Sequence, residues 1–452
     1  MRILLVATYD LGHQPLSIAA PAGRLREDGN EVRCRDLSIE KWDPADIEWA
    51  ERVAFSVPMH TAAVIAQQVI TEIRSRRPDL PIAAFGLYGH VLSGLVDRAL
   101  SGETDDALSA WIALDADTQV IFHDRIKPSL PARDLLPSLD QYAHLISGET
   151  AVPVAYVEAS HGCSHRCRHC PVPVVYDGRI RIMATESVIA DIEQQVAVGA
   201  KHVTFGDPDF LNGAQHSRRV VKEMHSRFPD LTFDCTVKVE HVIKYADVWK
   251  EFSESGCLFV VSAFESVDEA TLLRLDKGHT VADMERAVAI LKEHSIAVRP
   301  SWMPFTPWTT PDQVRKLLEF VAQNGLVGNV DVVQYTIRLL LPPGSLLLSH
   351  PDLVKYLGDY DSTRGFWSWE SADPQADSLH RRLATLVETK TAAGEHSVAI
   401  YNAVREACGL PMLDLSPDEI SQAPHLSEAW FCCAEPTASQ LIDFSPTETQ
   451  SA

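Results

Sequence analysis

Short apolar runs alternate with helical patterns of hydrophobic and polar residues along residues 1–124. The runs that predict strands are 2–8, 31–37, 52–58 and 81–89, and the segments with helical period are 15–29 and 61–77. Apolar strands that alternate with helices pair in parallel and form a doubly wound sheet. Ligands bind at the carboxyl ends of the strands in such a sheet. The loops expected there are 9–14, 58–60 and 86–90.

A second alternating series follows a proline-rich segment, 125–152, whose composition is typical of a linker. The runs that predict its strands are 154–160, 202–207, 231–237, 257–264, 297–305 and 330–340. Helical patterns such as 186–199 and 281–295 lie between them. Six strand–helix units predict a full or partial (β/α) barrel over 153–345, with its chemistry at the carboxyl-terminal rim of the strands. The remainder, 346–452, is expected to be mainly helical.

Charge and cysteine content narrow the class of protein. The 452 residues carry 40 Lys and Arg against 62 Asp and Glu, a formal charge of −22. This charge argues against a general nucleic-acid binder, because clustered basic side chains meet phosphate backbones. No run approaches the ~18–20 apolar residues of a membrane span, so a cytoplasmic protein without a membrane partner is expected. In that reducing compartment the nine cysteines favour metal or redox chemistry over disulfides.

Three cysteines lie within eight positions in the segment "SHGCSHRCRHC", directly after the expected strand 154–160. Cys163, Cys167 and Cys170 have the spacing C-x3-C-x2-C. Zinc, with His165 and His169 as further ligands, stays open, although structural zinc usually takes two separated ligand pairs. Three thiolates would instead hold a 4Fe–4S cluster and leave one iron free for a reactant. The cysteines expected in the hydrophobic core, because they lie in or beside apolar runs, are Cys34, Cys235, Cys257 and Cys408.

The cysteine motif resembles that of the radical S-adenosylmethionine (SAM) superfamily. The resemblance implies that the three cysteines bind a 4Fe–4S cluster and that its open iron binds the amino and carboxylate groups of SAM. It also implies that the reduced cluster cleaves SAM to methionine and a 5′-deoxyadenosyl radical, which abstracts hydrogen from a substrate. The protein would position the cofactors and exclude quenching groups.

Three further segments extend the resemblance and imply residues that contact SAM. "FGDPDF" is similar to the loop that binds the SAM amino group, which implies roles for Gly206 and Asp207. "VSAFESVDEATLLRLDKGHT" is similar to a segment of cobalamin-linked members, and there Glu265 and Ser266 would face the ribose or carboxylate. "RPSWMPFTPWTT" lies where ribose and adenine contacts are expected, and Ser301 is the residue that fits this role.

The N-terminal unit resembles the cobalamin-binding domain that precedes many radical SAM cores. The segment "RALSGETDDALSAWI" (98–112) is similar to the segment that closes this domain. The first loop reads "YDLGHQP" and lacks the cobalt-ligating pattern Asp-x-His-x-x-Gly. These residues leave two possibilities open. The domain binds cobalamin without a histidine ligand, or it has lost the cofactor.

The adjacent cysteines near the end of the chain lie in "AWFCCAEPT" (429–437). This segment resembles the signature of the CUAEP/CCAEP-tail radical SAM (seleno)protein family, in which the position of Cys433 holds selenocysteine or cysteine. The resemblance implies a reactive anion at Cys433, acting as nucleophile, hydrogen-atom donor or metalloid ligand, with Cys432 as its resolving partner. A peripheral disulfide or an incidental pair is the alternative.

Together these resemblances imply a radical SAM enzyme that uses cobalamin to methylate an unreactive centre of a small molecule or peptide. An electron donor such as flavodoxin or ferredoxin would supply its electrons. One alternative is a cobalamin-free radical SAM enzyme whose tail thiol takes part in carbon–sulfur, carbon–selenium or metalloid chemistry. Another is a non-enzymatic iron–sulfur or zinc protein that senses redox state or binds a partner.

Overall fold

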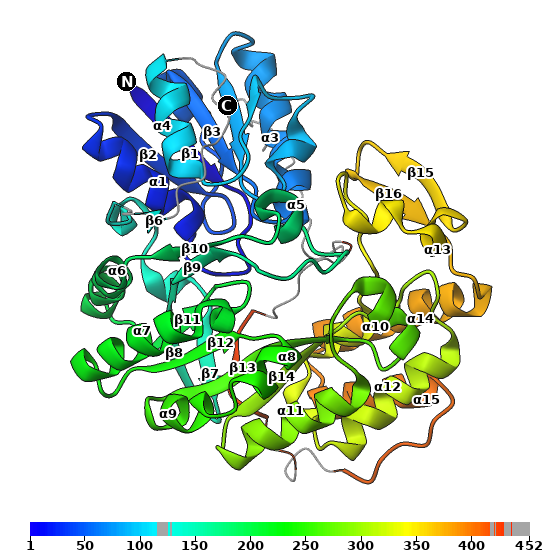
Figure 1. Cartoon of the computed structure of the whole chain (residues 1–452). Helices are drawn as coiled ribbons and strands as arrows, with labels where there is room; N and C mark the ends of the chain where they lie inside the picture. The colour runs from blue at the N-terminus through cyan, green and yellow to red at the C-terminus, as the bar shows by residue number, and fades with distance from the viewer. Residues whose placement is uncertain (115–124, 127–128, 416–419, 421, 429–434, 436–452) are drawn as a thin grey trace.

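The computed structural model describes residues 1–114, 125–126, 129–415, 420, 422–428 and 435. Figure 1 shows an N-terminal α/β unit above a larger α/β core, with the C-terminal helices packed beside the core. Among the described residues, no helix has the length and apolar character needed to cross a membrane.

The N-terminal unit is the predicted doubly wound sheet. Its strands pair in parallel in the order β2-β1-β3-β4-β5. They are β1 (Arg2–Ala7), β2 (Glu31–Asp36), β3 (Arg52–Ser56), β4 (Ile82–Phe85) and β5 (Arg98–Ala99). The helices are α1 (Leu16–Glu27), α2 (Ala45–Trp49), α3 (His60–Arg76) and α4 (Thr104–Leu114). Residues 3–6 of the inner strand β1 are fully buried, because helices cover both faces of a parallel sheet and favour continuous apolar runs.

The core is a curled sheet in the order β14-β13-β12-β11-β8-β7-β17. Five of its strands are parallel: β8 (Thr150–Val157), β11 (His202–Phe205), β12 (Thr232–Thr236), β13 (Cys257–Glu265) and β14 (Ala297–Trp302). Two antiparallel strands extend one edge: β7 (His144–Ser147) and β17 (His425–Leu426). The helices of this unit are α6 (Thr185–Ala197), α7 (Ala214–Arg227), α8 (Val239–Lys244), α9 (Val248–Glu254), α10 (Glu269–Leu275), α11 (Val281–Glu293) and α12 (Pro311–Gln323).

The prediction of a sixth strand at 330–340 is wrong. Residues Val332–Thr336 form a 3-10 helix, and a single parallel bridge joins Phe305 to Arg338. Side chains, rather than a neighbouring strand, form hydrogen bonds with backbone groups at the outer edge of β14. The Gln334 side-chain oxygen accepts a hydrogen bond from the Trp302 N–H at 2.8 Å. The Asn329 side chain likewise donates to the Val298 carbonyl at 2.8 Å, so the half-barrel ends here.

The segment predicted as a linker, 125–152, packs closely against both units over its described part. It contains two 3-10 turns, Arg133–Leu135 and Leu139–Gln141, before β7 begins. Arg133 is 7% exposed and forms an ion pair with Asp191 of α6 at 2.8 Å. Arg133 also donates to the Gln14 carbonyl of the N-terminal unit, so this side chain connects the two units.

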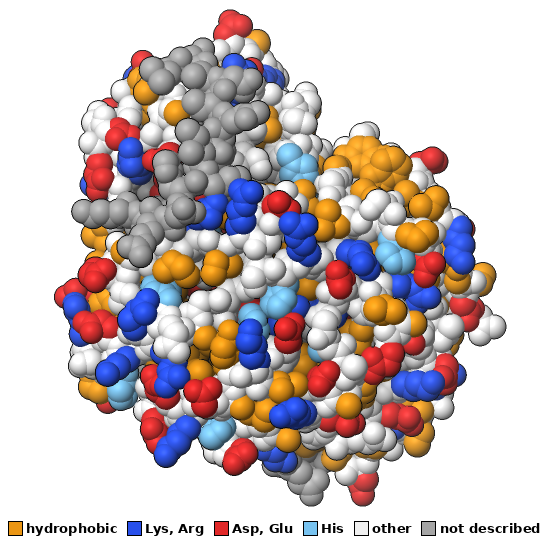
Figure 2. All heavy atoms as spheres, in the orientation of Figure 1, with side chains coloured by type: hydrophobic (Ala, Val, Ile, Leu, Met, Phe, Trp, Pro, Cys, Tyr) orange, Lys and Arg blue, Asp and Glu red, His pale blue; other side chains and the backbone are white. Residues whose placement is uncertain are grey.

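Over its described residues, the C-terminal segment is mainly helical, as predicted, and also contains a hairpin. Its helices are α13 (Pro351–Val354), α14 (Pro374–Ala392) and α15 (Ser397–Ala407), and its hairpin joins β15 (Leu357–Asp361) to β16 (Phe366–Trp369). Figure 2 shows apolar side chains gathered over this hairpin, and charges of both signs interspersed over the core. The cysteines that were expected in the core are all buried: Cys34, Cys235, Cys257 and Cys408.

Candidate active site

A short antiparallel pair presents the cysteine loop between the two units (Figure 1). Strand β9 (Ser160–Gly162) pairs with β10 (Ile180–Met183), and α5 (Val172–Tyr176) lies between them in sequence. Gly162 has a φ of +76°, and a Cβ atom there would lie 2.3 Å from the Arg179 carbonyl oxygen. Only glycine fits this turn, which directs the chain into the cysteine loop.

Hydrogen bonds hold the cysteine loop at both ends. The Ser164 hydroxyl and N–H donate to the Asn212 side-chain oxygen at 2.6 and 3.2 Å. The Arg168 N–H donates to the Leu275 carbonyl at the end of α10, and the Leu347 N–H donates to the Arg168 carbonyl. The loop is therefore fixed by residues distant in sequence, which preorganises the three thiols.

The three thiols line one cavity of 680 Å³. Cys163 and Cys167 are 8% and 6% exposed, and Cys170 is half-buried. Among the described residues that line the cavity, these three are the cysteines. Burial raises the pKa of Cys163 to about 11 and also raises the pKa of Cys167, so a bound metal must displace their protons. This donor set of three thiolates fits a 4Fe–4S cluster with one open iron.

The cavity continues from the cysteines to the carboxyl ends of the N-terminal strands. The predicted loops at 9–14, 58–60 and 86–90 contribute to its wall through Asp10, His60 and Tyr88. The core contributes the ends of β11, β12, β13 and β14. Its volume lies within the range of about 300–1,000 Å³ typical of small-molecule sites. One chamber thus joins the functional ends of both sheets.

A buried ion pair lies in the cavity wall beside the cysteines. The Lys277 Nζ is 3.0 Å from Glu265 Oε1, and His169 Nε2 is 3.3 Å from the same oxygen. Burial opposes ionisation of Glu265, but Lys277 and His169 offset it and hold its pKa well below the usual range. The pKa of Lys277 is raised despite burial, by Glu265 and Cys167. The sequence interpretation did not single out Lys277, although it lies in the segment that suggested Glu265.

Gly206 and Asp207 both line the cavity, and their contacts hold the strand that leads to the cysteines. Asp207 is 1% exposed and accepts hydrogen bonds from the Ala159 N–H at 2.8 Å and the Ser160 hydroxyl at 2.5 Å. A Cβ atom on Gly206 would lie 2.0 Å from the Tyr156 hydroxyl oxygen, so glycine permits this packing. A role for either residue in SAM binding stays a prediction.

The other predicted SAM contacts differ in their placement. Glu265 and Ser301 both line the cavity, and Ser301 on β14 is 8% exposed. Ser266 does not occur among the described residues of the cavity wall. Its hydroxyl accepts a hydrogen bond from the Asp268 N–H at 3.1 Å, at the start of α10. The structure therefore brings Gly206, Asp207, Glu265 and Ser301 together with the cysteines and leaves Ser266 outside.

Cys432 and Cys433 lie outside the described residues, but residues on either side of them are placed. Glu428 lines the cavity and accepts a hydrogen bond from the Tyr9 hydroxyl at 2.9 Å. Glu435, the glutamate of the CCAEP segment, lies with its Oε1 3.2 Å from Arg338 Nε. The Glu435 N–H also donates to the Arg338 carbonyl.

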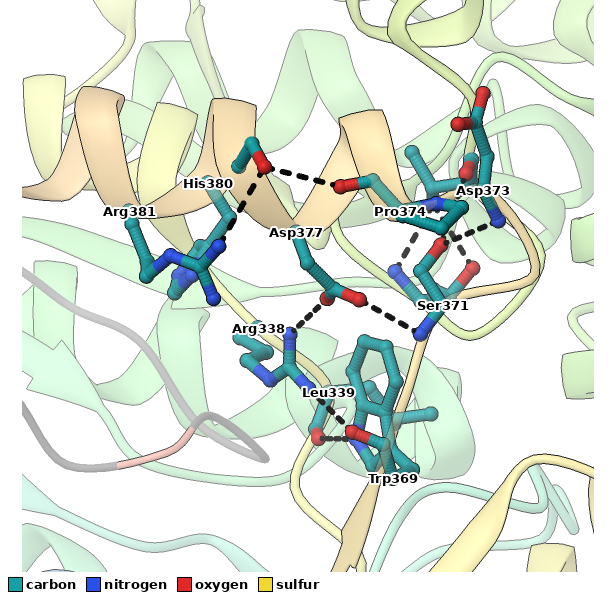
Figure 3. Close-up of polar contacts among 12 residues, drawn as sticks. Arg338, Leu339, Trp369, Ser371, Asp373, Pro374, Asp377, His380 and Arg381 are labelled. Carbon is teal, nitrogen blue, oxygen red and sulfur yellow. Dashed lines mark hydrogen bonds and ion pairs between the residues drawn. The ribbon is translucent and has the colours of Figure 1, made fainter.

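Arg338 is itself held by a network that Figure 3 shows. Its guanidinium donates to Asp377 at 2.8 Å and to the Trp369 carbonyl at 2.6 Å, and it lies 3.6 Å from the Trp369 ring centroid. The Trp369 indole N–H donates to the Leu339 carbonyl, and Asp377 also accepts the Ser371 N–H. This network gives the glutamate of the tail a rigid partner.

A second polar contact joins the two units at the cavity. His161 of β9 lies 2.9 Å from Glu103 of the N-terminal unit and 3.0 Å from Glu158 of the core. Burial opposes protonation of His161, but Glu103 and Glu158 raise its pKa well above the ordinary value. Glu103 belongs to the segment 98–112, which resembles the end of a cobalamin-binding domain. This resemblance was the only signal in the sequence that pointed to Glu103.

The Asp207→Asn substitution is expected to change how stability depends on pH. Burial raises the pKa of Asp207 from 3.8 to about 7, so the folded chain favours the neutral carboxyl group. The stability that this group contributes is fully present below about pH 4 and is lost as the pH rises through 7. Between these values, the native chain should lose on the order of a few kcal/mol relative to Asp207→Asn in urea unfolding. Parallel profiles for the two chains would contradict this assignment.

Comparison with known proteins settles the family of the core. Residues 157–321 match the model of the radical SAM superfamily, and this range contains all three cysteines and the strands around them. The chain therefore contains a radical SAM domain. All three segments that suggested SAM contacts lie inside the matched range.

Curated relatives of the chain include two methylases. The hopanoid C-3 methylase of Methylococcus capsulatus is 22% identical over 333 residues, which cover 64% of this chain and 62% of the relative. The hopanoid C-2 methylase of Rhodopseudomonas palustris is 23% identical over 317 residues, covering 65% of this chain and 56% of the relative. The chain thus spans about three fifths of the length of these relatives.

Solved structures share the fold of both units. The radical SAM methyltransferase TsrM from Kitasatospora setae, with cobalamin and a 4Fe–4S cluster bound, matches with a TM-score of 0.54. It is 19% identical and covers 72% of this chain and 70% of its own. The cobalamin-dependent radical enzyme OxsB, with aqua-cobalamin and SAM bound, has a TM-score of 0.64, is 12% identical and covers 86% and 67%. The three predicted cofactors all occur in these neighbouring structures.

Proposed function

We propose that this protein is a cobalamin-dependent radical SAM enzyme that methylates an unreactive centre of a small molecule or peptide. The observation that carries the proposal is the single cavity that joins Cys163, Cys167 and Cys170 to the strand ends of the N-terminal sheet. In this proposal the chamber lets the reactive parts of the two cofactors and the substrate meet in one place. Its volume favours a small molecule or the side chain of a peptide.

The cavity residues of the two units have different roles in this proposal. When bound, the cluster supplies the electron that cleaves SAM, and cobalamin carries the methyl group. In this proposal Glu265, Ser301, Gly206 and Asp207 orient SAM beside the open iron. Lys277 keeps Glu265 ionised. We place the reaction in the cytoplasm, with a flavodoxin- or ferredoxin-like protein as electron donor.

The names of the relatives support methyl transfer as the reaction class. Two of them are named as methylases, and the TsrM structures are named for a methyltransferase, one of them with tryptophan bound as substrate. Another relative, from Synechocystis, is named as an anaerobic magnesium-protoporphyrin IX monomethyl ester cyclase.

Cobalamin binding to the full chain tests the role of the N-terminal unit. Met59 lines the cavity at the start of α3, so we expect Met59→Trp to fill part of the chamber and weaken cobalamin binding at least about tenfold. Met412 is 63% exposed, and Met412→Trp serves as a matched control that leaves binding unchanged. Equilibrium dialysis with hydroxocobalamin measures both effects. A folded, iron-loaded native chain that binds no cobalamin would overturn the proposal.

A second candidate function assigns direct chemistry to the CCAEP tail. Glu428 in the cavity wall and Glu435 on Arg338 fix both sides of the segment that contains Cys432 and Cys433. Of these two glutamates, Glu428 belongs to the cavity wall itself. In this version the enzyme is cobalamin-free, belongs to the CUAEP/CCAEP-tail family, and uses Cys433 as nucleophile, hydrogen-atom donor or metalloid ligand.

The reactivity of the tail thiol separates the two versions. If Cys433 is catalytic, it should react with iodoacetamide at pH 7 at least about 100-fold faster than Cys408, because reactivity follows exposure and thiolate content. Burial raises the pKa of Cys408 to about 11, which makes this cysteine a slow internal reference. Peptide mass spectrometry gives both rates. Cys433→Ser should still form 5′-deoxyadenosine, whereas equal labelling rates for the two cysteines would remove the catalytic version.

A further inference from the structure

Two histidines and an aspartate converge behind the cysteine loop, outside the wall of the main cavity. His165 lies between Cys163 and Cys167 in the loop, Asp209 follows β11, and His241 lies on α8. The candidate donor atoms of the three side chains lie within 4.8 Å of one another. Asp209 Oδ2 is 2.8 Å from His241 Nδ1 and 3.8 Å from His165 Nε2.

These three atoms are buried without a hydrogen-bond partner. His165 Nε2, Asp209 Oδ2 and His241 Nδ1 all lack a hydrogen bond of good geometry, although Asp209 Oδ2 and His241 Nδ1 lie 2.8 Å apart. Asp209 is fully buried and His241 is 4% exposed. Buried polar atoms nearly always have a partner, and an unsatisfied one calls for an unseen ion or water. Three such atoms that point at a common space are the arrangement expected around a cation.

The donors and their spacing fit a transition-metal ion. Ligand atoms about 2.0–2.1 Å from a tetrahedral zinc ion lie about 3.3 Å from one another, and the distances of 2.8 and 3.8 Å to Asp209 lie on either side of this value. Imidazole nitrogens suit zinc and iron, and two histidines with one carboxylate form a recurrent set for both.

Neighbouring charges leave Asp209 available for the cation. The carboxylate of Glu240 lies 3.8 Å from His165 Nδ1, on the other side of the ring from Asp209. At this distance Glu240 adds negative charge beside the His165 ring. The ammonium of Lys238 lies 4.0 Å from Glu240, so Glu240 partly balances its charge. The other oxygen of Asp209 accepts the Leu211 N–H, which fixes the carboxylate.

We propose that His165, Asp209 and His241 bind a divalent transition-metal ion such as Zn²⁺, separate from the iron–sulfur cluster. The ion ties the cysteine loop to the end of β11 and to α8, and water or an exogenous ligand completes its coordination. The ion therefore helps to fix the conformation of the loop that holds Cys163 and Cys167. The proposal does not depend on which reaction the enzyme catalyses.

Zinc binding to the full chain with Cys163, Cys167 and Cys170 all replaced by serine tests the site without the cluster. We expect one Zn²⁺ per chain in equilibrium dialysis with elemental analysis, and X-ray absorption should show nitrogen and oxygen ligands without sulfur. Asp209→Asn keeps an oxygen for the Leu211 N–H but removes the charge, and it should weaken binding at least about 100-fold, as should His241→Gln. His294→Gln, a half-buried histidine elsewhere, is the control that should bind normally.

The cluster-loaded native chain provides a second measurement if the triple variant does not fold. Purified anaerobically from zinc-supplemented cells, it should contain about one zinc beside about four irons. Asp209→Asn should lose the zinc and keep most of the iron. Zinc that persists in both Asp209→Asn and His241→Gln, a sulfur ligand shell, or no zinc on the folded chain would overturn the proposal.

Discussion

Replacing Cys163 by alanine is expected to lower the iron content from about four per chain to below about one and to abolish SAM cleavage. The thiol is 8% exposed, lies in a loop fixed by Asn212 and lines the main cavity, so no other cysteine among the described wall residues can replace it. The rate of 5′-deoxyadenosine formation should fall at least about 1,000-fold, equivalent to roughly 4 kcal/mol of barrier.

Cys408→Ala is the matched control for this substitution. Cys408 is 7% exposed but packs in the core beside α15, away from the described wall of the main cavity. Its loss should cost some stability through the small void that it leaves, while iron content and SAM cleavage persist. Iron analysis and chromatography of the nucleoside product measure both variants. Unchanged iron in Cys163→Ala would contradict its role as a cluster ligand.

Lys277→Met should be the most destabilising substitution outside the cysteines. The methionine keeps most of the apolar stem but leaves Glu265 buried with only His169 beside its carboxylate. Breaking a buried ion pair from one side costs roughly 3–5 kcal/mol of unfolding free energy, because an unpaired charge stays behind. Urea unfolding under anaerobic conditions measures the loss.

The pH dependence of this loss has a definite sign. In the native chain the pKa of Glu265 is held below its ordinary value, so its stabilising contribution is present above the unfolded pKa and is lost as the pH falls through the folded one. In Lys277→Met the deficit should shrink at low pH, because protonation removes the unpaired charge. The double variant Glu265→Gln/Lys277→Met should recover much of the loss. A deficit that is independent of pH and persists in the double variant would contradict this explanation.

The cysteine loop and the N-terminal sheet could be predicted from the sequence because their signals are local. The spacing of Cys163, Cys167 and Cys170 carries its chemistry within eight residues, and apolar runs such as 2–8 and 52–58 fit only buried strands. Glu265 and Ser301 were found by resemblance to a family, and both line the cavity.

Features that depend on contacts between distant residues could not be predicted in this way. The run 330–340 is as apolar as a strand, but Gln334 occupies the edge of β14 with its side chain and the backbone turns into a 3-10 helix. Lys277 faces Glu265 only because α10 returns the chain across the strand end. Asp209 lies in the segment "FGDPDF" and His241 in no quoted segment, and only folding places these two side chains beside His165.

The most direct test of the central claim uses one anaerobic preparation of the native chain. Iron, sulfide, zinc and cobalamin are quantified on it, and the nucleoside products are then assayed after reduction in the presence of methyl-labelled SAM. The account predicts about four irons with sulfide, bound cobalamin, and both 5′-deoxyadenosine and S-adenosylhomocysteine. Zinc in place of iron at the three cysteines, with neither product formed, would contradict it.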